Sequence, residues 1–233
     1  MTRRRDDKRA PPHWHLLKEG LALGSRMWRG IGRLGERGPE TGERLMVIPG
    51  FLATDRTTLG LQRALAAAGY RVTGWGLGLN NGVQADTLAR IVAGIESFGR
   101  GGKVILVGWS LGGLYAREAA KKRPDLVAKV ITLASPFSGD RRSNNVWWLY
   151  EWVAGHRVDE PPIETDTSEK PPVPTLAIWS PRDGIVAPAA ARGEEGERDE
   201  ELAIESSHMG FAVGGAVFPK VVEAVKAFPS LRA

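Results

Sequence analysis

The sequence predicts an α/β fold, in which a minimal, mostly parallel sheet of about six strands is covered by helices on both faces. Two observations support this class. Short apolar runs alternate with segments of helical composition from position 44 onward. The apolar runs are continuous and do not alternate with polar residues, which is typical of strands buried on both faces of a parallel sheet.

Each predicted element depends on a local signal. Strands are expected where the apolar runs lie, at residues 44–48, 70–75, 103–107, 127–133, 175–179 and 201–205. Pro49-Gly50 ends the first run, because proline and glycine favour turns. Helices are expected at residues 57–68, 85–98, 111–122 and 219–228, and Gly69 ends the first of them.

Three regions stand apart from this alternation. Residues 1–12 are charged and end in two prolines, which predicts a disordered basic tail. Residues 13–40 form an N-terminal extension whose apolar residues are spaced as in an amphipathic helix. We expect this helix to pack on the α/β domain of residues 41–233, and the alternative is a helix that lies on a membrane surface. Residues 138–172 are long, polar and aromatic, which predicts a lid insertion after the fourth strand.

The composition is that of an ordinary globular protein, with 42% hydrophobic and 25% charged residues. No apolar stretch approaches about 18 residues, so no transmembrane helix is expected. The basic N-terminus lacks the apolar segment of a secretory signal, so we expect a cytoplasmic protein. The absence of cysteine excludes disulfides, cysteine nucleophiles and thiolate metal sites.

The net charge of +5 allows two interpretations. Much of the excess lies in the N-terminal segment and at Arg141-Arg142, where it could attract phosphate or an anionic membrane face. We favour a solvated tail with scattered surface charges, because no nucleic-acid-binding motif accompanies the charge. Nucleic acid is therefore not expected as a partner, and the N-terminal segment is a candidate for weak peripheral membrane contact.

The segment Gly108-Trp109-Ser110-Leu111-Gly112 matches the pattern G-x-S-x-G. The pattern alone is weak, but here it directly follows the most apolar strand and precedes a helix. A sharp strand-to-helix turn exposes the serine hydroxyl, and the flanking glycines avoid clashes where strand and helix nearly touch. The helix N-terminus then offers N–H groups to developing negative charge. This context predicts that Ser110 is a nucleophile.

The sequence resembles the α/β-hydrolase family, and within it the lipase and esterase branch. The resemblance covers roughly residues 44–228 and depends on four blocks in the family's order. These blocks are residues 47–51 (VIPGF), 108–113 (GWSLGG), 179–186 (WSPRDGIV) and 206–210 (SSHMG). Each follows or ends a predicted strand, where the active-site loops of an open parallel sheet belong.

A serine hydroxyl needs a base, and the base needs an orienting carboxylate. The family's chain order of serine, acid and histidine implies that His208 is the base, with His156 as a histidine of the lid or surface. The resemblance also implies Asp183 as the acid, since it follows the fifth strand in a tight turn. Asp140 is the alternative acid, because some family members carry it after the preceding strand.

Acyl transfer also needs N–H donors for the oxyanion. The resemblance implies one donor from Leu111 and a second from Phe51, with Leu52 as the alternate. We expect substrate contacts from Leu52, Trp109, Trp147, Trp148, Trp152 and Met209. The aromatic cluster at 147–152 could equally be the lid's own small core, and Trp109 could brace the turn from below.

The resemblance thus implies hydrolysis of a small-molecule or lipid carboxylic ester through an acyl-enzyme on Ser110. Alternatives are a thioester, amide or lactone as the substrate of the same three residues, or a hydrolase-like binding protein without catalysis. No cofactor or metal is expected, because the H-E-x-x-H and P-loop patterns are absent. The sequence leaves the acyl chain length and the oligomeric state open.

Overall fold

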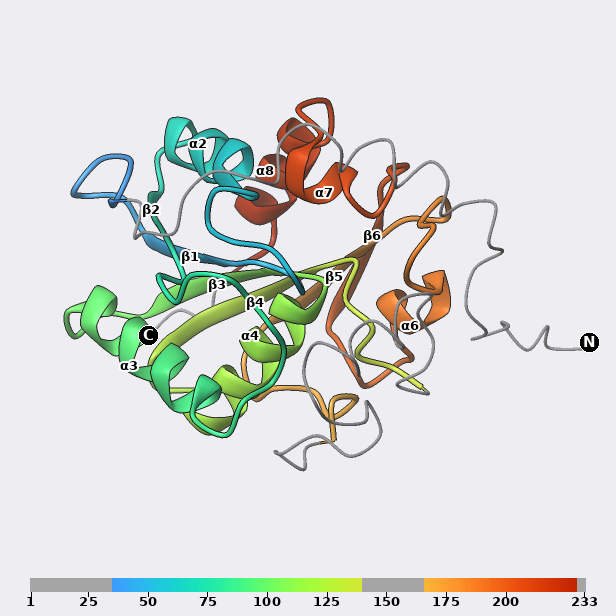
Figure 1. The fold of residues 1–233 in the computed structure, drawn as a ribbon, viewed down its shortest axis with the longest axis horizontal. Helices are drawn as coiled ribbons and strands as arrows, with labels where there is room; N and C mark the ends of the chain where they lie inside the picture. The colour runs from blue at the N-terminus through green and yellow to red at the C-terminus, as the bar shows by residue number, and fades with distance from the viewer. Residues whose placement is uncertain (1–34, 140–165, 230–233) are drawn as a thin grey trace, which may run out of the picture.

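A computed structural model describes residues 35–139 and 166–229, and Figure 1 shows a sheet between two layers of helices. The strands are β1 (Arg44–Ile48), β2 (Arg71–Gly74), β3 (Val104–Trp109), β4 (Val127–Leu133), β5 (Thr175–Trp179) and β6 (Glu200–Ala203). The helices are α2 (Leu59–Ala67), α3 (Thr87–Gly99), α4 (Leu111–Lys122), α6 (Pro188–Arg192), α7 (Gly210–Val213) and α8 (Phe218–Ala227). The predicted fold class is confirmed.

The strand order reverses once along the sheet. The strands lie in the order β2-β1-β3-β4-β5-β6, and every neighbouring pair is parallel. The chain runs outward from β1 to β2, returns to β3 on the other side of β1, and continues outward to β6. In open parallel sheets, ligand sites lie at the carboxyl ends of the strands where the order reverses. Here that position is between the ends of β1 and β3.

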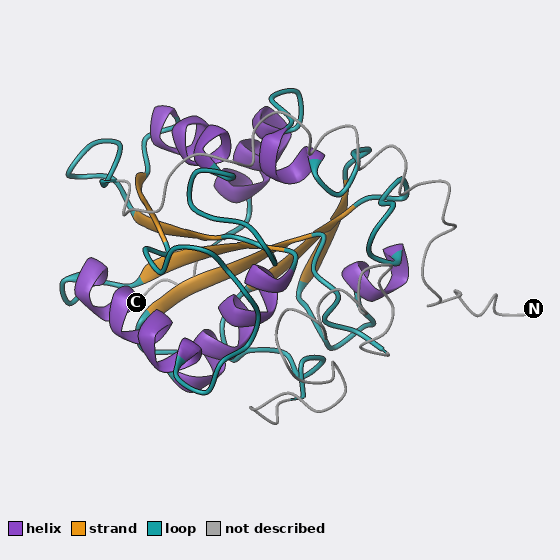
Figure 2. Cartoon of the chain, viewed as in Figure 1, coloured by secondary structure: helices purple, strands orange, loops and turns teal. Residues whose placement is uncertain are grey.

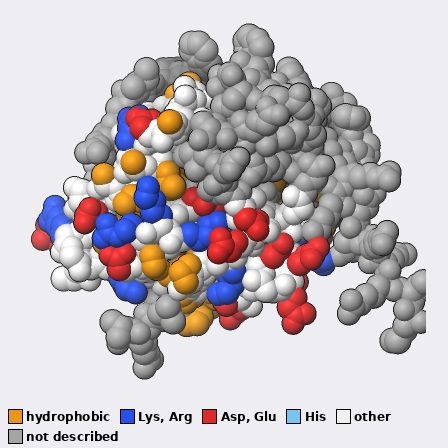
Figure 3. Space-filling view, turned by 90° about the horizontal axis from the view of Figure 1, so that it is seen from below, with side chains coloured by type: hydrophobic (Ala, Val, Ile, Leu, Met, Phe, Trp, Pro, Cys, Tyr) orange, Lys and Arg blue, Asp and Glu red, His pale blue; other side chains and the backbone are white. Residues whose placement is uncertain are grey.

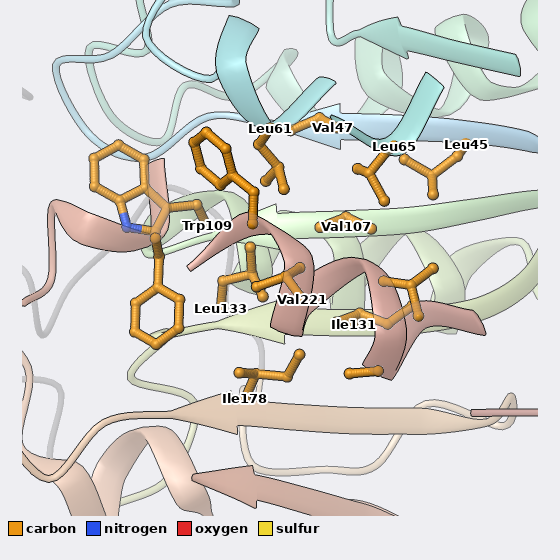
Figure 4. Close-up of a cluster of buried hydrophobic side chains, with 14 of the residues drawn as sticks. Leu45, Val47, Leu61, Leu65, Val107, Trp109, Ile131, Leu133, Ile178 and Val221 are labelled. Atoms are coloured by element: carbon orange, nitrogen blue, oxygen red, sulfur yellow. The ribbon is translucent and has the colours of Figure 1, made fainter. Parts of the chain in front are cut away.

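The sheet is buried on both faces, which explains the continuous apolar runs. Successive side chains of a strand point to opposite faces, so Leu45 and Val47 of β1 join one core while Met46 and Ile48 join the other. The first core includes residues of α2, α7 and α8, and the second includes residues of α3 and α4, so helices cover both faces (Figure 2). Figure 4 shows the first core, where Leu61, Leu65 and Val221 face Val47, Val107, Ile131 and Ile178.

Most predicted elements match the structure closely. β1, β4, β5 and α4 have the predicted bounds, and the other predicted elements shift by one or two residues at their ends. Two short helices, α6 and α7, were not predicted. All four residues of β6 are exposed, unlike those of a doubly covered strand, because β6 is the edge of the sheet. Its Glu200 and Glu201 suit that position, since charged residues discourage further strand pairing at an edge.

The structure describes only part of the predicted lid of residues 138–172. Its described ends, residues 138–139 and 166–172, contain neither helix nor strand. The predicted tail, most of the N-terminal extension and the aromatic cluster at 147–152 lie outside the described residues. The domain boundaries therefore stay predictions.

A buried arginine of α4 binds the main chain at residues 167–169. The guanidinium of Arg117, in α4, is fully buried and donates hydrogen bonds to the carbonyls of residues 167, 168 and 169 and of Glu197. It also lies 4.1 Å from the ring centroid of Phe137. Burial lowers the pKa of Arg117 to about 10, which leaves it protonated at neutral pH. The described C-terminal end of the predicted lid, at residues 167–169, is therefore anchored to α4.

The described surface carries charges of both signs. Figure 3 shows Lys and Arg side chains interspersed with Asp and Glu over the described part of one face. Among the helices within residues 35–139 and 166–229, the longest has 13 residues, and none of these helices could cross a bilayer.

Two glycine-to-alanine changes in helices should have opposite effects on stability. A Cβ at Gly112 would lie 2.2 Å from the carbonyl oxygen of Ile48 and 2.7 Å from that of Pro49. Because these are backbone atoms, Gly112→Ala should lower the free energy of unfolding by about 1–3 kcal/mol. A Cβ at Gly94 in α3 would meet only the Met46 Cε at 3.7 Å, so Gly94→Ala should raise it by about 0.5–1 kcal/mol. Urea denaturation measures both, and equal effects would contradict the close packing of α4.

Candidate active site

Ser110 occupies the sharp turn between β3 and α4. Its φ of 54° and ψ of −123° are rare for a residue with a side chain and cost on the order of 1–3 kcal/mol. The surroundings hold this conformation. The Ser110 N–H donates to the carbonyl of Leu133 at the end of β4 (2.8 Å), and its carbonyl accepts the N–H of Gly113 (3.0 Å). Ser110 is partly exposed at the carboxyl edge of the sheet.

The glycines around Ser110 permit backbone contact between α4 and the sheet. A Cβ at Gly108 would lie 2.3 Å from the carbonyl oxygen of Gly112, and a Cβ at Gly50 would lie 3.0 Å from the Cβ of Ser110. The loop after β1 thus passes directly beside Ser110. The glycines of the G-x-S-x-G pattern are required by this proximity.

Asp183 and His208 form a buried pair at the same edge of the sheet. The Nδ1–H of His208 donates to Oδ2 of Asp183 at 2.8 Å, and both residues are almost fully buried. The other carboxylate oxygen accepts the N–H groups of Ile185 and Val186, each at 2.8 Å. Three donors therefore fix the carboxylate, and the carboxylate fixes the orientation of the imidazole ring.

Ser180 ties the turn that carries Asp183 to the loop that carries His208. Its buried hydroxyl donates to the carbonyl of Ser206 (2.6 Å) and accepts the N–H groups of Ser206 and Arg182, both at 3.0 Å. Sequence reasoning missed this role, because a serine before a proline also suits a simple turn. Residues 180–184 and 204–207 lie in neither helix nor strand, so side-chain bonds of this kind help to set the relative position of the two loops.

Trp109 connects the strand end beside Ser110 to His208. Its indole N–H donates to the carbonyl of His208 at 3.1 Å, and the two rings lie 5.4 Å apart between centroids. Trp109 is only 3% exposed and belongs to the core. It therefore supports the loop of His208 from the core side, and its predicted contact with substrate stays a prediction. Met209 is also buried in this core, and its predicted contact with substrate likewise stays a prediction.

The loop after β1 faces Ser110 from the other side. Leu52 has a positive φ of 56°, and its N–H donates to the carbonyl of Asn80 at 2.7 Å. Phe51 and Leu52 are partly exposed, as is Leu111. Leu111 is the first residue of α4, so its N–H has no acceptor within the helix. The positive end of the helix dipole thus lies beside the Ser110 hydroxyl.

The remaining predicted site residues lie outside the described chain. These are the tryptophans at 147, 148 and 152, together with His156 and Asp140. Within residues 35–139 and 166–229, no group of three or more histidine or acidic side chains is arranged to hold a metal ion. The chemistry that the described groups can perform is proton transfer by an imidazole and attack by a hydroxyl.

Comparisons with known proteins agree with this fold. A family model described as the Alpha/beta hydrolase family matches residues 13–230. A search of curated proteins gave no match. The chain is similar to a monoacylglycerol lipase from Paleococcus ferrophilus, with 18% identity and a TM-score of 0.61 over 84% of this chain and 98% of the other.

Two further similar structures are named for other activities. The naproxen esterase of Bacillus subtilis has 12% identity and a TM-score of 0.57, covering 91% of this chain and 96% of its own. The thioesterase domain from the curacin biosynthetic pathway has 13% identity and a TM-score of 0.57, covering 83% and 98%. At these identities the likeness concerns the fold.

Removal of the Ser180 hydroxyl should destabilise the protein. Ser180→Ala leaves two buried groups of Ser206 without their partner, which should lower the free energy of unfolding by about 1–3 kcal/mol. The matched control is Ser168→Ala, whose hydroxyl bonds only the exposed carboxylate of Asp166 and should change stability by less than about 0.5 kcal/mol. Chemical denaturation compares the two variants. Similar small losses in both would show that the Ser180 link contributes little.

Proposed function

The chain belongs to the alpha/beta hydrolase family, and from this premise we propose that it cleaves carboxylic esters through Ser110, His208 and Asp183. Family membership supports hydrolase chemistry in general. The single observation that carries the finer proposal is the buried hydrogen bond between His208 and Asp183, at the same sheet edge as the strained Ser110. Strain and a buried histidine–carboxylate pair are features that proteins retain at sites of function.

The proposed reaction has two stages. The Oγ of Ser110 attacks the ester carbonyl carbon while Nε2 of His208 takes its proton, and Asp183 stabilises the imidazolium that results. The tetrahedral intermediate then expels the alcohol, which receives that proton from His208. Water next attacks the acyl-enzyme with His208 again as base, and the carboxylic acid leaves as Ser110 recovers its proton.

The negative oxygen of the intermediate needs N–H donors that are already in position. We assign one donor to Leu111, whose N–H begins α4. For the second we assign Phe51, in the loop that passes beside Ser110 at Gly50. Leu52 stays the alternate, and its N–H donates to the carbonyl of Asn80 at 2.7 Å.

A thioester is the second candidate substrate. One of the similar structures is named a thioesterase domain, and the same nucleophile, base and acid serve both leaving groups. Amides and lactones are further members of the class that the same residues could attack. Comparison of oxygen and sulfur esters of one acyl group distinguishes the first two candidates.

The nucleophile assignment predicts selective covalent labelling. A fluorophosphonate probe should label the wild-type protein once, at Ser110, and the wild type should hydrolyse p-nitrophenyl acyl esters. Ser110→Ala should remain folded, lose the label and lose turnover by a factor on the order of 10³ or more. Peptide mapping after labelling locates the modified residue. Retained turnover in Ser110→Ala would refute the nucleophile.

The acid assignment predicts a ranking of two aspartates. Asp183→Asn should lower kcat by a factor on the order of 10³–10⁴, because the amide no longer holds the imidazole in the tautomer that accepts the serine proton. Asp140→Asn should leave kcat near the wild-type value. Steady-state kinetics on one p-nitrophenyl ester gives both numbers, and the reverse ranking would move the acid to Asp140.

A further inference from the structure

Asn80 is a fully buried polar residue that the reaction above does not use. It lies in the loop after β2 and is 1% exposed. Its side-chain amide donates from Nδ2 to the carbonyl of Pro49 at 2.9 Å, and its main chain bonds Leu52 and Ala53. All three partners belong to the loop after β1, which passes beside Ser110.

The bonds to Pro49 and Leu52 fix the peptide groups on either side of the peptide 50–51. The carbonyl of Pro49 belongs to the peptide 49–50, and the Nδ2 of Asn80 fixes it. The N–H of Leu52 belongs to the peptide 51–52, and the carbonyl of Asn80 fixes it at 2.7 Å. The peptide between them, 50–51, carries the N–H of Phe51. Asn80 therefore holds the chain on both sides of the proposed oxyanion donor.

A clamp is needed there because of the residues on each side of that peptide. Gly50 has the widest backbone freedom of any residue, and a Cβ there would lie only 3.0 Å from side-chain atoms of Ser110 and Trp109. Leu52 has a left-handed φ of 56°, which is unfavourable for a leucine. Without fixed partners, the peptide 50–51 could rotate about Gly50 and turn its N–H away from Ser110.

Asn80 is itself held by its surroundings. Its Oδ1 accepts the N–H of Gly82 (3.3 Å) and lies 3.5 Å from the hydroxyl of Tyr115 in α4. The start of the same loop is fixed by Asp55, whose carboxylate accepts the N–H groups of Trp75 and Gly76 at 2.9 and 3.0 Å. The amide thus has a defined orientation, and it relates the loop after β1 to the helix that begins at Leu111.

We propose that Asn80 is a positioning residue for the oxyanion site: its side-chain amide fixes the peptide 49–50 so that the N–H of Phe51 faces Ser110. This inference rests on the proposed serine hydrolase function. It assigns to Asn80 an effect on the transition state, because the oxyanion forms only there. Substrate binding in the ground state should depend on Asn80 much less.

The test uses two substitutions in the chain of residues 1–233. Asn80→Asp keeps the size and the Oδ1 acceptor but places an oxygen against the carbonyl of Pro49, and Asn80→Ala removes the amide. Both should lower kcat on a p-nitrophenyl ester by about tenfold to a hundredfold with little change in KM. Both should lower the affinity for n-butylboronic acid by a similar factor. This inhibitor forms a tetrahedral adduct on the serine.

The neighbouring Asn81 provides the matched control. It is exposed, so Asn81→Asp adds the same charge one residue away and should leave kcat and boronate affinity unchanged. Asn80→Ser is a milder third variant, should the other two fold poorly. Urea denaturation of every variant establishes that the folded protein is being compared.

The outcomes separate this inference from the proposed function. Folded Asn80 variants with wild-type kcat and boronate affinity would overturn the positioning role. A rise in KM alone would also overturn it, since that would make Asn80 a substrate-binding residue. Unfolding of all three variants would mean that the amide supports the fold and not the site. A wild-type protein that neither hydrolyses esters nor reacts with a fluorophosphonate would instead refute the serine hydrolase function.

Discussion

The start of α4 packs so closely against β1 and β3 that no Cβ fits at Gly108 or Gly112. This contact forces a sharp turn after β3 and places Ser110 in a strained conformation with φ of 54°. The strain, on the order of 1–3 kcal/mol, is offset by the two cores that hold the strand and the helix on either side. One packing constraint therefore exposes the serine and directs the N-terminus of α4 toward the end of β1.

The strand order then determines which loops meet at that turn. Because the order reverses between β1 and β3, the loop after β1 lies beside Ser110, and β4, β5 and β6 follow on the other side. The loops after β5 and β6 are irregular, and side-chain bonds to main-chain groups fix them. Ser180 joins the two loops, and Trp109 holds the carbonyl of His208. The buried pair of Asp183 and His208 thus depends on residues that take no part in the chemistry.

Local sequence signals predicted the sheet and its long helices well. The apolar runs identified β4 and β5, and helical composition identified α4, with the bounds that the structure has. The family resemblance selected Asp183 and His208, whose Oδ2 and Nδ1 atoms lie 2.8 Å apart. Helices as short as α6 and α7 carry too few residues for a periodic signal, and the exposure of β6 depends on a strand order that no local pattern contains. The roles of Asn80 and Ser180 were missed because they arise from hydrogen bonds between loops distant in the chain.

The structure of the protein after reaction with a fluorophosphonate is the decisive measurement for catalysis by Ser110, His208 and Asp183. We expect a covalent bond from phosphorus to Oγ of Ser110, with the phosphoryl oxygen about 3 Å from the N–H groups of Leu111 and Phe51. We also expect the ring of His208 to keep its bond to Asp183 and to direct Nε2 toward the modified serine. Phosphorus on another residue, or an imidazole at position 208 turned away from the adduct, would refute these roles.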